Sequence, residues 1–273
     1  MTVLTLPAEP AAEATAALRP VPWRRMAWVT WRQQRATFIS VPAVLGAVAL
    51  FLLVASLKMH HDYAAIAGCS LDIGHDSAAC QQGISHFNTV DWTAGNTVLI
   101  LMNLLPALLG AFTGAPLLAR ELETGTFRYA WTQGLGRERQ AIAKLVLVGV
   151  MMAVLAGGLG ELFAWFFQPF LHVEEMNALT STVFVTRGIV FAAWTLAAFA
   201  TGAFLGMLLR RILPAMAGTL GVYLLTALAA WYLRDHYPAA TFWPMQFIEA
   251  GWLLVLSVLL MAATVRLVRG RAA

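Results

Sequence analysis

Long uncharged stretches dominate the pattern of hydrophobic and polar positions along this chain. Four of them contain no Asp, Glu, Lys or Arg: residues 36–57, 92–119, 188–209 and 212–233. Each reaches the about 20 residues that a helix needs to cross about 30 Å of hydrocarbon. Two further apolar stretches contain a single glutamate each, Glu161 and Glu249. The pattern predicts an all-α membrane protein with six spans, at about residues 36–57, 92–119, 145–169, 184–209, 212–233 and 247–267.

Composition and charge support this assignment and give it a direction. Hydrophobic residues make up 60% of the chain and charged residues 12%, against about 45–50% and about 25% in soluble globular chains. If the loops alternate between the two sides, fifteen Lys and Arg residues fall on one side and only Lys58, Arg187 and Arg234 on the other. This bias predicts that both termini are cytoplasmic. The formal net charge of +4 then belongs to the inner membrane face and does not indicate nucleic-acid binding.

Two short segments precede the first span. Residues 1–17 are rich in Ala, Pro and Glu and lack the apolar core of a signal peptide, so we expect a disordered cytoplasmic tail. Residues 22–35 contain Trp side chains with interspersed arginines, which predicts an amphipathic helix lying in the membrane plane. The alternative is a cytoplasmic extension of the first span.

The longest external segment, residues 58–91, contains both cysteines of the chain and four of its six histidines. In an oxidising compartment we expect Cys69 and Cys80 to form a disulfide. The other polar residues offer candidate metal ligands, although no pair has the spacing of a known site: His60, His61, Asp62, His75, Asp76 and His86. We therefore predict no metal centre. A second external segment, residues 234–246, contains Pro238 and Pro244, which disfavour one continuous helix, so we expect it to dip into the outer membrane surface.

Polar groups within or next to the spans are the candidates for a substrate cavity or an intramembrane charge site. Asn103, Thr113, Tyr223 and Thr226 would line a cavity or hydrogen-bond across helices. Glu161 and Glu249 are placed where either one would reach Arg187 at the outer end of the fourth span. Two GxxxG matches, starting at Gly110 and at Gly202, predict close helix packing without identifying the neighbour.

Catalytic motifs are missing from the sequence. A P-loop requires Gly-Lys, and the two lysines of this chain follow Leu57 and Ala143. Neither HExxH nor GxSxG occurs. We therefore predict that the chain is not an enzyme and carries no cofactor.

The loop between the second and third spans contains eight of the 32 charged residues, within residues 120–144. Gly125 is expected to end the preceding helix, and Thr126 to cap a short helix over residues 127–133. That helix would present Phe127, Tyr129 and Trp131. Exposed aromatic side chains rimmed by charge indicate a protein contact. The alternative is that these rings anchor the loop at the membrane surface.

These loop residues resemble the characteristic loop of ABC-2 type permeases. The resemblance rests on residues 118–126 (LARELETGT), 136–139 (GRER) and Lys144, and residues 114–121 and 130–133 are similar to an actinobacterial branch. It implies a type V-like ABC exporter membrane domain in the cell membrane. The resemblance assigns the contact with an ATPase to the following residues: Glu121, Glu123, Gly125, Thr126, Phe127, Arg128, Tyr129, Trp131 and Arg137.

The resemblance also implies partners and a function. The permease would form a homodimer, or a heterodimer with a second permease, and would bind two copies of a separately encoded ATPase that holds ATP and Mg. The expected substrate is a hydrophobic or amphiphilic drug, antibiotic or lipid-like molecule. Three alternatives stay open: a proton-coupled secondary transporter using Glu161 or Glu249, an enzyme acting on lipid headgroups at His60, His61, Asp62 and His75, and a signalling subunit that binds a ligand without moving it.

Overall fold

A computed structural model describes residues 23–66, 68–69, 78–87, 89, 92–125, 137–173, 181–234 and 241–270. These residues form helices and their connections, with no strand among them. Six helices, counted within the described ranges, are long and apolar enough to span a membrane. The all-α prediction and the six predicted spans are therefore confirmed.

The helices follow one another along the chain in a simple order. They are α1 (Trp23–Gln33), α2 (Arg35–Ile66), α3 (Ala78–His86), α4 (Trp92–Leu109), the π-helical turn η3 (Gly110–Gly114), α5 (Ala115–Glu123), α7 (Arg137–Phe166), α8 (Gln168–Val173), α9 (Ser181–Val185), α10 (Gly188–Leu209), α11 (Ile212–Arg234) and α12 (Phe242–Gly270). The segments α4, η3 and α5 form one continuous span.

Several spans extend beyond the predicted limits, and α2, α7 and α12 do so by the largest margins. Helix α2 continues past Lys58 to Ile66, and Lys58 and Asp62 form an i,i+4 ion pair at 3.9 Å on it. Helix α7 begins at Arg137, because charged residues are good helix formers and do not end a helix. Helix α12 begins at Phe242. Pro244 lies in its first turn, where its missing N–H leaves no intrahelical hydrogen bond unmade. Helix α11 ends at Arg234 and Thr241 is not helical, so the described part of residues 234–246 does not form one continuous helix, as expected. Residues 235–240 of the predicted dipping segment lie outside the described residues.

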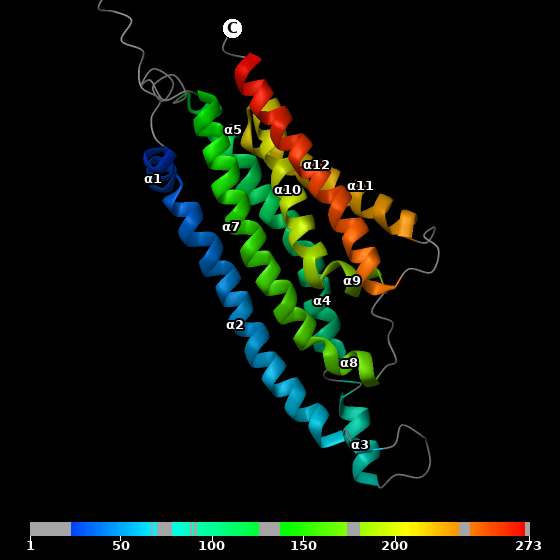
Figure 1. The fold of residues 1–273 in the computed structure, drawn as a ribbon. Coiled ribbons are helices and arrows are strands. Elements are labelled where there is room, and N and C mark those ends of the chain that lie inside the picture. Colours follow the sequence, from blue (N-terminus) through cyan, green and yellow to red (C-terminus); the bar gives the residue numbers. More distant parts are fainter. Residues whose placement is uncertain are drawn as a thin grey trace, which may run out of the picture.

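Helix α10 is the centre of the bundle (Figure 1). It contacts α4, η3, α5, α7, α11 and α12, and its small residues allow these close approaches. A Cβ on Gly202 would overlap the carbonyl oxygen of Gly110, and one on Gly114 would overlap that of Phe199. The two GxxxG motifs therefore pack on each other, which identifies the neighbour that the sequence left open.

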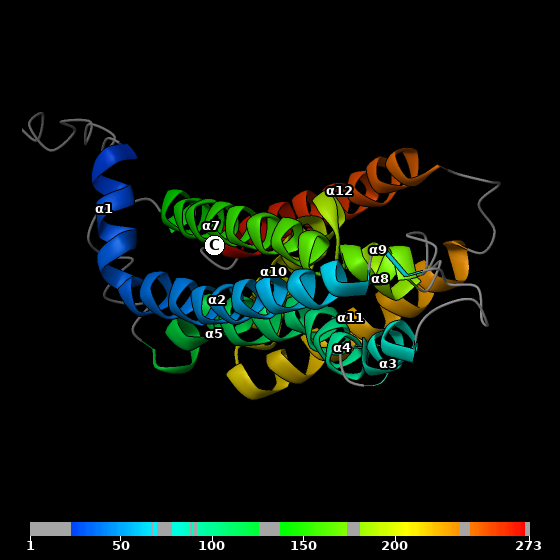
Figure 2. The ribbon, with the colours of Figure 1, turned by 90° about the horizontal axis from the view of Figure 1, so that it is seen from below.

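Helix α2 lies at the side of the bundle and packs mainly on α7. The preceding α1 is a separate helix, and Figure 2 shows it running across the end of α2. This arrangement matches the predicted separate amphipathic helix and not a straight extension of the first span. Its position in a membrane plane stays a prediction.

The bundle has two ends that we name by their contents. The loop end contains α1, the end of α5, the start of α7 and the end of α12, and the disulfide end contains α3 and α8 (Figure 1). At the disulfide end, Cys69 and Cys80 form the predicted disulfide, with a Cα–Cα distance of 5.7 Å.

Candidate functional site

Two glutamates at the loop end attach α5 to its neighbours. Glu121 forms an ion pair with Lys144 of α7. The side chain of Lys144 is only 1% exposed, so the carboxylate compensates a charge that would otherwise be buried alone. Glu123 accepts a hydrogen bond at 3.0 Å from the backbone N–H of Ile212, the first residue of α11. A carboxylate at this place satisfies a free N–H and complements the positive end of the helix dipole.

The tight turn between α10 and α11 makes the second attachment possible. Arg210 adopts a left-handed conformation with φ 58° and ends α10. Helix α11 therefore starts two residues later, beside the C-terminal turn of α5. The predicted spans, which end at residue 209 and begin at residue 212, leave only Arg210 and Arg211 for this turn, but they do not indicate which residue contacts the start of α11.

Helix α5 ends where the sequence predicted. Thr124 donates hydrogen bonds from its backbone N–H and its hydroxyl to the carbonyl of Arg120, at 3.0 and 2.8 Å. Gly125 follows with φ 69°, a conformation that glycine adopts without steric cost. Thr126, Phe127, Arg128, Tyr129 and Trp131 lie outside the described residues, so the predicted short helix stays a prediction.

The start of α7, where the chain returns, is also attached to its surroundings. Arg137 is the first residue of this helix. Glu138 forms an ion pair with Arg269 near the end of α12. Gln140 donates a hydrogen bond at 3.0 Å to the side-chain carbonyl of Gln33 in α1. The two ends of the segment 126–136 are therefore linked to four helices, α1, α7, α11 and α12.

A cavity of about 610 Å³ opens beside this attachment, between α1–α2 and η3–α5. Its walls combine amides, hydroxyls, two charged groups and an apolar patch, from Gln33, Gln34, Thr37, Phe112, Thr113, Pro116, Leu117, Arg120, Glu121 and Thr124. Thr113, one of the predicted cavity residues, lies in this wall. Its hydroxyl donates to the carbonyl of Leu109 on its own helix.

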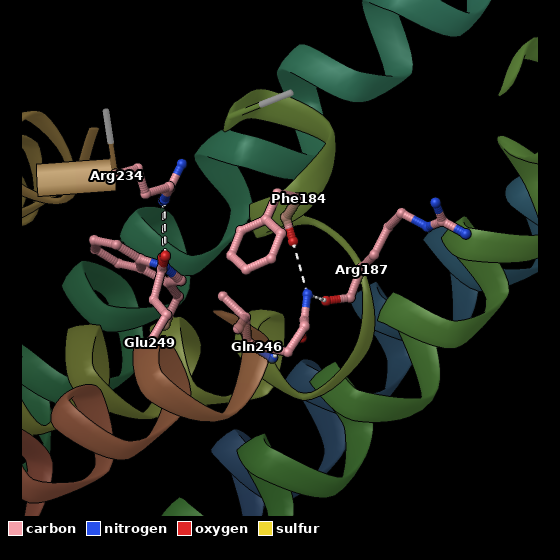
Figure 3. A network of polar contacts seen from close by, with 7 residues as sticks. Phe184, Arg187, Arg234, Gln246 and Glu249 are labelled. Atoms are coloured by element: carbon pink, nitrogen blue, oxygen red, sulfur yellow. Dashed lines mark hydrogen bonds and ion pairs between the residues drawn. The ribbon is translucent and has the colours of Figure 1, made fainter. Parts of the chain in front are cut away.

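A buried polar network joins α10, α11 and α12 (Figure 3). The guanidinium of Arg234 binds the carboxylate of Glu249 through two N–H donors, each at 2.8 Å. The indole N–H of Trp194 donates to the same carboxylate at 2.8 Å. Both charged side chains are more than nine-tenths buried. This bidentate geometry satisfies the buried carboxylate and fixes the end of α11 against α12.

Gln246 holds the start of α10 in place. Its amide N–H₂ donates to the carbonyls of Phe184 and Arg187, and its oxygen accepts from the N–H of Val190, each at 3.2 Å. The guanidinium of Arg187 points away from Glu249, on the far side of Gln246 (Figure 3). The predicted pair of Glu249 with Arg187 is therefore wrong, because Arg234 binds this carboxylate.

Asn103 and Tyr223 are brought together beside this network. The Tyr223 hydroxyl donates to the backbone carbonyl of Asn103 at 3.0 Å, and the Asn103 amide donates to the carbonyl of Thr182 at 3.2 Å. Both line a cavity of about 240 Å³ whose other walls are Thr182, Val185, Trp194, Ala227, Trp231 and Arg234. Thr226, the fourth predicted cavity residue, donates to Val222 of its own helix. The four predicted residues are thus divided between separate places.

Comparison with known proteins places the chain in a family. A family model described as ABC-2 membrane transporter related matches residues 42–234. The chain belongs to this ABC-2 family. Neither a curated protein nor a solved structure matches it. Family membership indicates a multi-pass membrane protein that is the permease component of an ABC transporter, and it confirms the resemblance found in the loop.

In this ABC-2 family member the remaining charged candidates are separate from the network. Glu161 is exposed on α7, and no ion pair joins it to Arg187 in the part of the chain that the structure describes. Burial lowers the pKa of Arg187, and the negative charge of Glu161 opposes this shift. Arg234 was not predicted as a site residue. Arg234 ends α11, and only a short connection separates it from the start of α12, which contains Glu249. This short separation is the sequence signal that could have suggested Arg234 as the partner of Glu249.

The external histidines do not form a metal site in the described residues, where no group of three or more His, Cys, Asp or Glu is placed to hold a metal ion. His60 stacks on Trp165 with ring centroids 4.7 Å apart, and the ring nitrogen contacts the Trp165 carbonyl at 3.1 Å. His75 and Asp76 lie outside the described residues.

Proposed function

We propose that this permease exports a hydrophobic or amphiphilic molecule and is driven by a separately encoded ATPase that binds the segment 126–136. The loop end is then cytoplasmic, in agreement with the bias of fifteen basic residues against three. The complex contains two permease chains and two ATPase chains, and ATP with Mg binds to the ATPase. The absence of a P-loop from the sequence supports a separate ATPase.

The attachment of the loop through Glu121 and Glu123 is the observation that carries this proposal. A contact that moves residues 126–136 acts on α7 through the pair Glu121–Lys144 and on α11 through the bond from Glu123 to Ile212. A loop that served only as a solvated connection would not require these links. The aromatic side chains Phe127, Tyr129 and Trp131 provide the area that a protein partner buries.

Co-purification tests the proposal. The chain is purified in detergent together with the ATPase encoded beside it, and the variant Phe127→Ala plus Trp131→Ala is compared with the wild type. We expect the wild type to retain the ATPase and the loop variant to lose it, because aromatic anchors contribute most of the binding energy at such contacts.

The matched control is Trp243→Ala plus Phe247→Ala, which removes two exposed aromatic side chains of α12 away from the loop end. This variant should retain the ATPase. If no ATPase co-purifies with the wild type, or if the loop variant retains it equally well, the proposed function is wrong.

A further inference from the structure

The cavity of about 610 Å³ at the loop end has two kinds of wall. Phe112, Pro116 and Leu117 form an apolar side, and amides, hydroxyls and two charged side chains form a polar side. The volume lies within the about 300–1,000 Å³ that small-molecule sites occupy. Helix α2 packs on α7, so the space between α2 and α5 stays open. A ligand that matches both kinds of wall is an amphiphile.

The charges around the cavity determine which amphiphile fits. Glu121 is neutralised by Lys144. Within the described ranges, neither an ion pair nor a side-chain hydrogen bond engages the guanidinium of Arg120, which is exposed. The undescribed segment that follows, residues 126–136, contains no Asp or Glu. Among the residues that the structure describes, Arg120 is therefore an available cation beside an apolar wall.

Most of the remaining polar groups of the cavity already have partners. Thr113 and Thr124 donate to carbonyls of their own helices, and the Gln33 oxygen accepts from Gln140. A ligand would therefore gain its main polar interaction from Arg120, whose planar guanidinium binds a carboxylate, sulfonate or phosphate through two parallel hydrogen bonds.

We propose that this cavity binds a small anionic amphiphile, with its headgroup on Arg120 and its apolar body against Phe112, Pro116 and Leu117. The inference rests on the proposed function, because such a ligand is the transported substrate at its cytoplasmic access site. Arg120 lies directly before Glu121, so an occupied cavity borders the residue that links the loop to α7. A cationic amphiphile is disfavoured by the same arginine.

A binding experiment without the ATPase tests the site independently of the proposed partner. The full chain is placed in phosphatidylcholine nanodiscs and titrated with 11-(dansylamino)undecanoic acid and with its uncharged primary amide, with dansyl fluorescence as the readout. We expect the acid to bind about tenfold more tightly than the amide, because a hydrogen-bonded ion pair distinguishes them.

The variant Arg120→Gln should reduce binding of the acid to the level of the amide, and Arg120→Lys should keep part of the preference because it keeps the charge. Arg139→Gln is the control, since Arg139 is an exposed arginine at the same end that does not line the cavity. Thr37→Trp, which fills the cavity, should weaken the acid and the amide alike. Size-exclusion profiles verify that each variant is folded.

Equal binding of acid and amide by the wild type, or unchanged preference in Arg120→Gln, overturns the proposal. Displacement of the acid when the nanodiscs contain phosphatidylglycerol also overturns it, because the site would then hold an anionic membrane lipid. The variant Phe127→Ala plus Trp131→Ala should bind the acid like the wild type. If this variant loses the ATPase, its binding of the acid should not change. The proposed ATPase contact and the proposed anion site can therefore be contradicted independently.

Discussion

At the residue scale, the buried pair of Arg234 and Glu249 shows how an intramembrane charge is accommodated. Burying either charge alone would cost free energy, whereas the pair compensates both charges. The Trp194 indole N–H gives the Glu249 carboxylate a further hydrogen bond. Because Arg234 ends α11 and Glu249 lies in α12, this ion pair links the two helices. This structural role distinguishes it from Glu161, which is exposed on α7.

Replacing Glu249 tests this role. Glu249→Leu leaves Arg234 buried without its carboxylate, and we expect a loss of about 3–5 kcal/mol in the free energy of unfolding. The double variant Arg234→Leu plus Glu249→Leu should recover most of this loss, because no uncompensated charge remains. Thermal unfolding in detergent measures both.

Glu161→Leu serves as the control and should change stability by no more than about 0.5 kcal/mol, as exposed positions usually do. If Glu249→Leu is no less stable than this control, the pair does not hold α11 against α12.

At the scale of helices, the continuous span α4–η3–α5 organises the loop end. Its π-helical turn packs closely on α10 through glycines, and its last turn contacts the start of α11 through Glu123. The span therefore connects the central helix, the peripheral α11 and the loop, which is the arrangement that a moving loop needs in order to act on the bundle.

The contact of Glu123 with α11 predicts a local change in hydrogen exchange. In Glu123→Ala the N–H of Ile212 loses its acceptor, and loss of such a cap costs about 0.5–2 kcal/mol. We expect faster deuterium uptake at the start of α11, around residues 212–215, and unchanged uptake in the middle of α10. Exchange followed by mass spectrometry measures it.

Glu123→Gln keeps an acceptor oxygen and should exchange nearly like the wild type. Equal uptake in Glu123→Ala and the wild type would show that the start of α11 does not depend on this side chain.

At the scale of the whole molecule, the two ends differ in chemistry. The loop end carries the attachment residues and the larger cavity, and the disulfide end carries the bond between Cys69 and Cys80. The exposed apolar side chains of α11 and α12 cover the length between these ends, as expected for surfaces that face lipid or a second copy of the chain.

This polarity predicts the orientation of the molecule in the cell membrane. In a background with both cysteines replaced by serine, Gln81→Cys at the disulfide end should react with a membrane-impermeant maleimide in intact cells. Arg139→Cys at the loop end should react only after permeabilisation. Both positions are exposed, so access to the reagent alone distinguishes them. The reverse labelling pattern would place the loop end outside and contradict the proposed ATPase contact.

The sequence was sufficient for features that depend on local composition. A span must be apolar over about 20 residues whatever surrounds it, so the six helices could be predicted from long apolar stretches with at most one charged residue each. The end of α5 at Gly125 could be read for a similar reason, because a positive φ is a property of one residue. The cysteines needed only a common side of the membrane and a short separation.

Partners across helices could not be read in the same way, because they depend on how the helices pack. In the sequence, Arg187 at the outer end of the fourth span was the partner considered for Glu249. The structure instead places Arg234 on this carboxylate and Gln246 between Arg187 and Glu249. The two GxxxG motifs were recognisable separately, but their mutual contact required the placement of η3 on α10. The cavity beside Arg120 likewise exists because α2 packs on α7 and not on α5, a choice that hydrophobic periodicity does not encode.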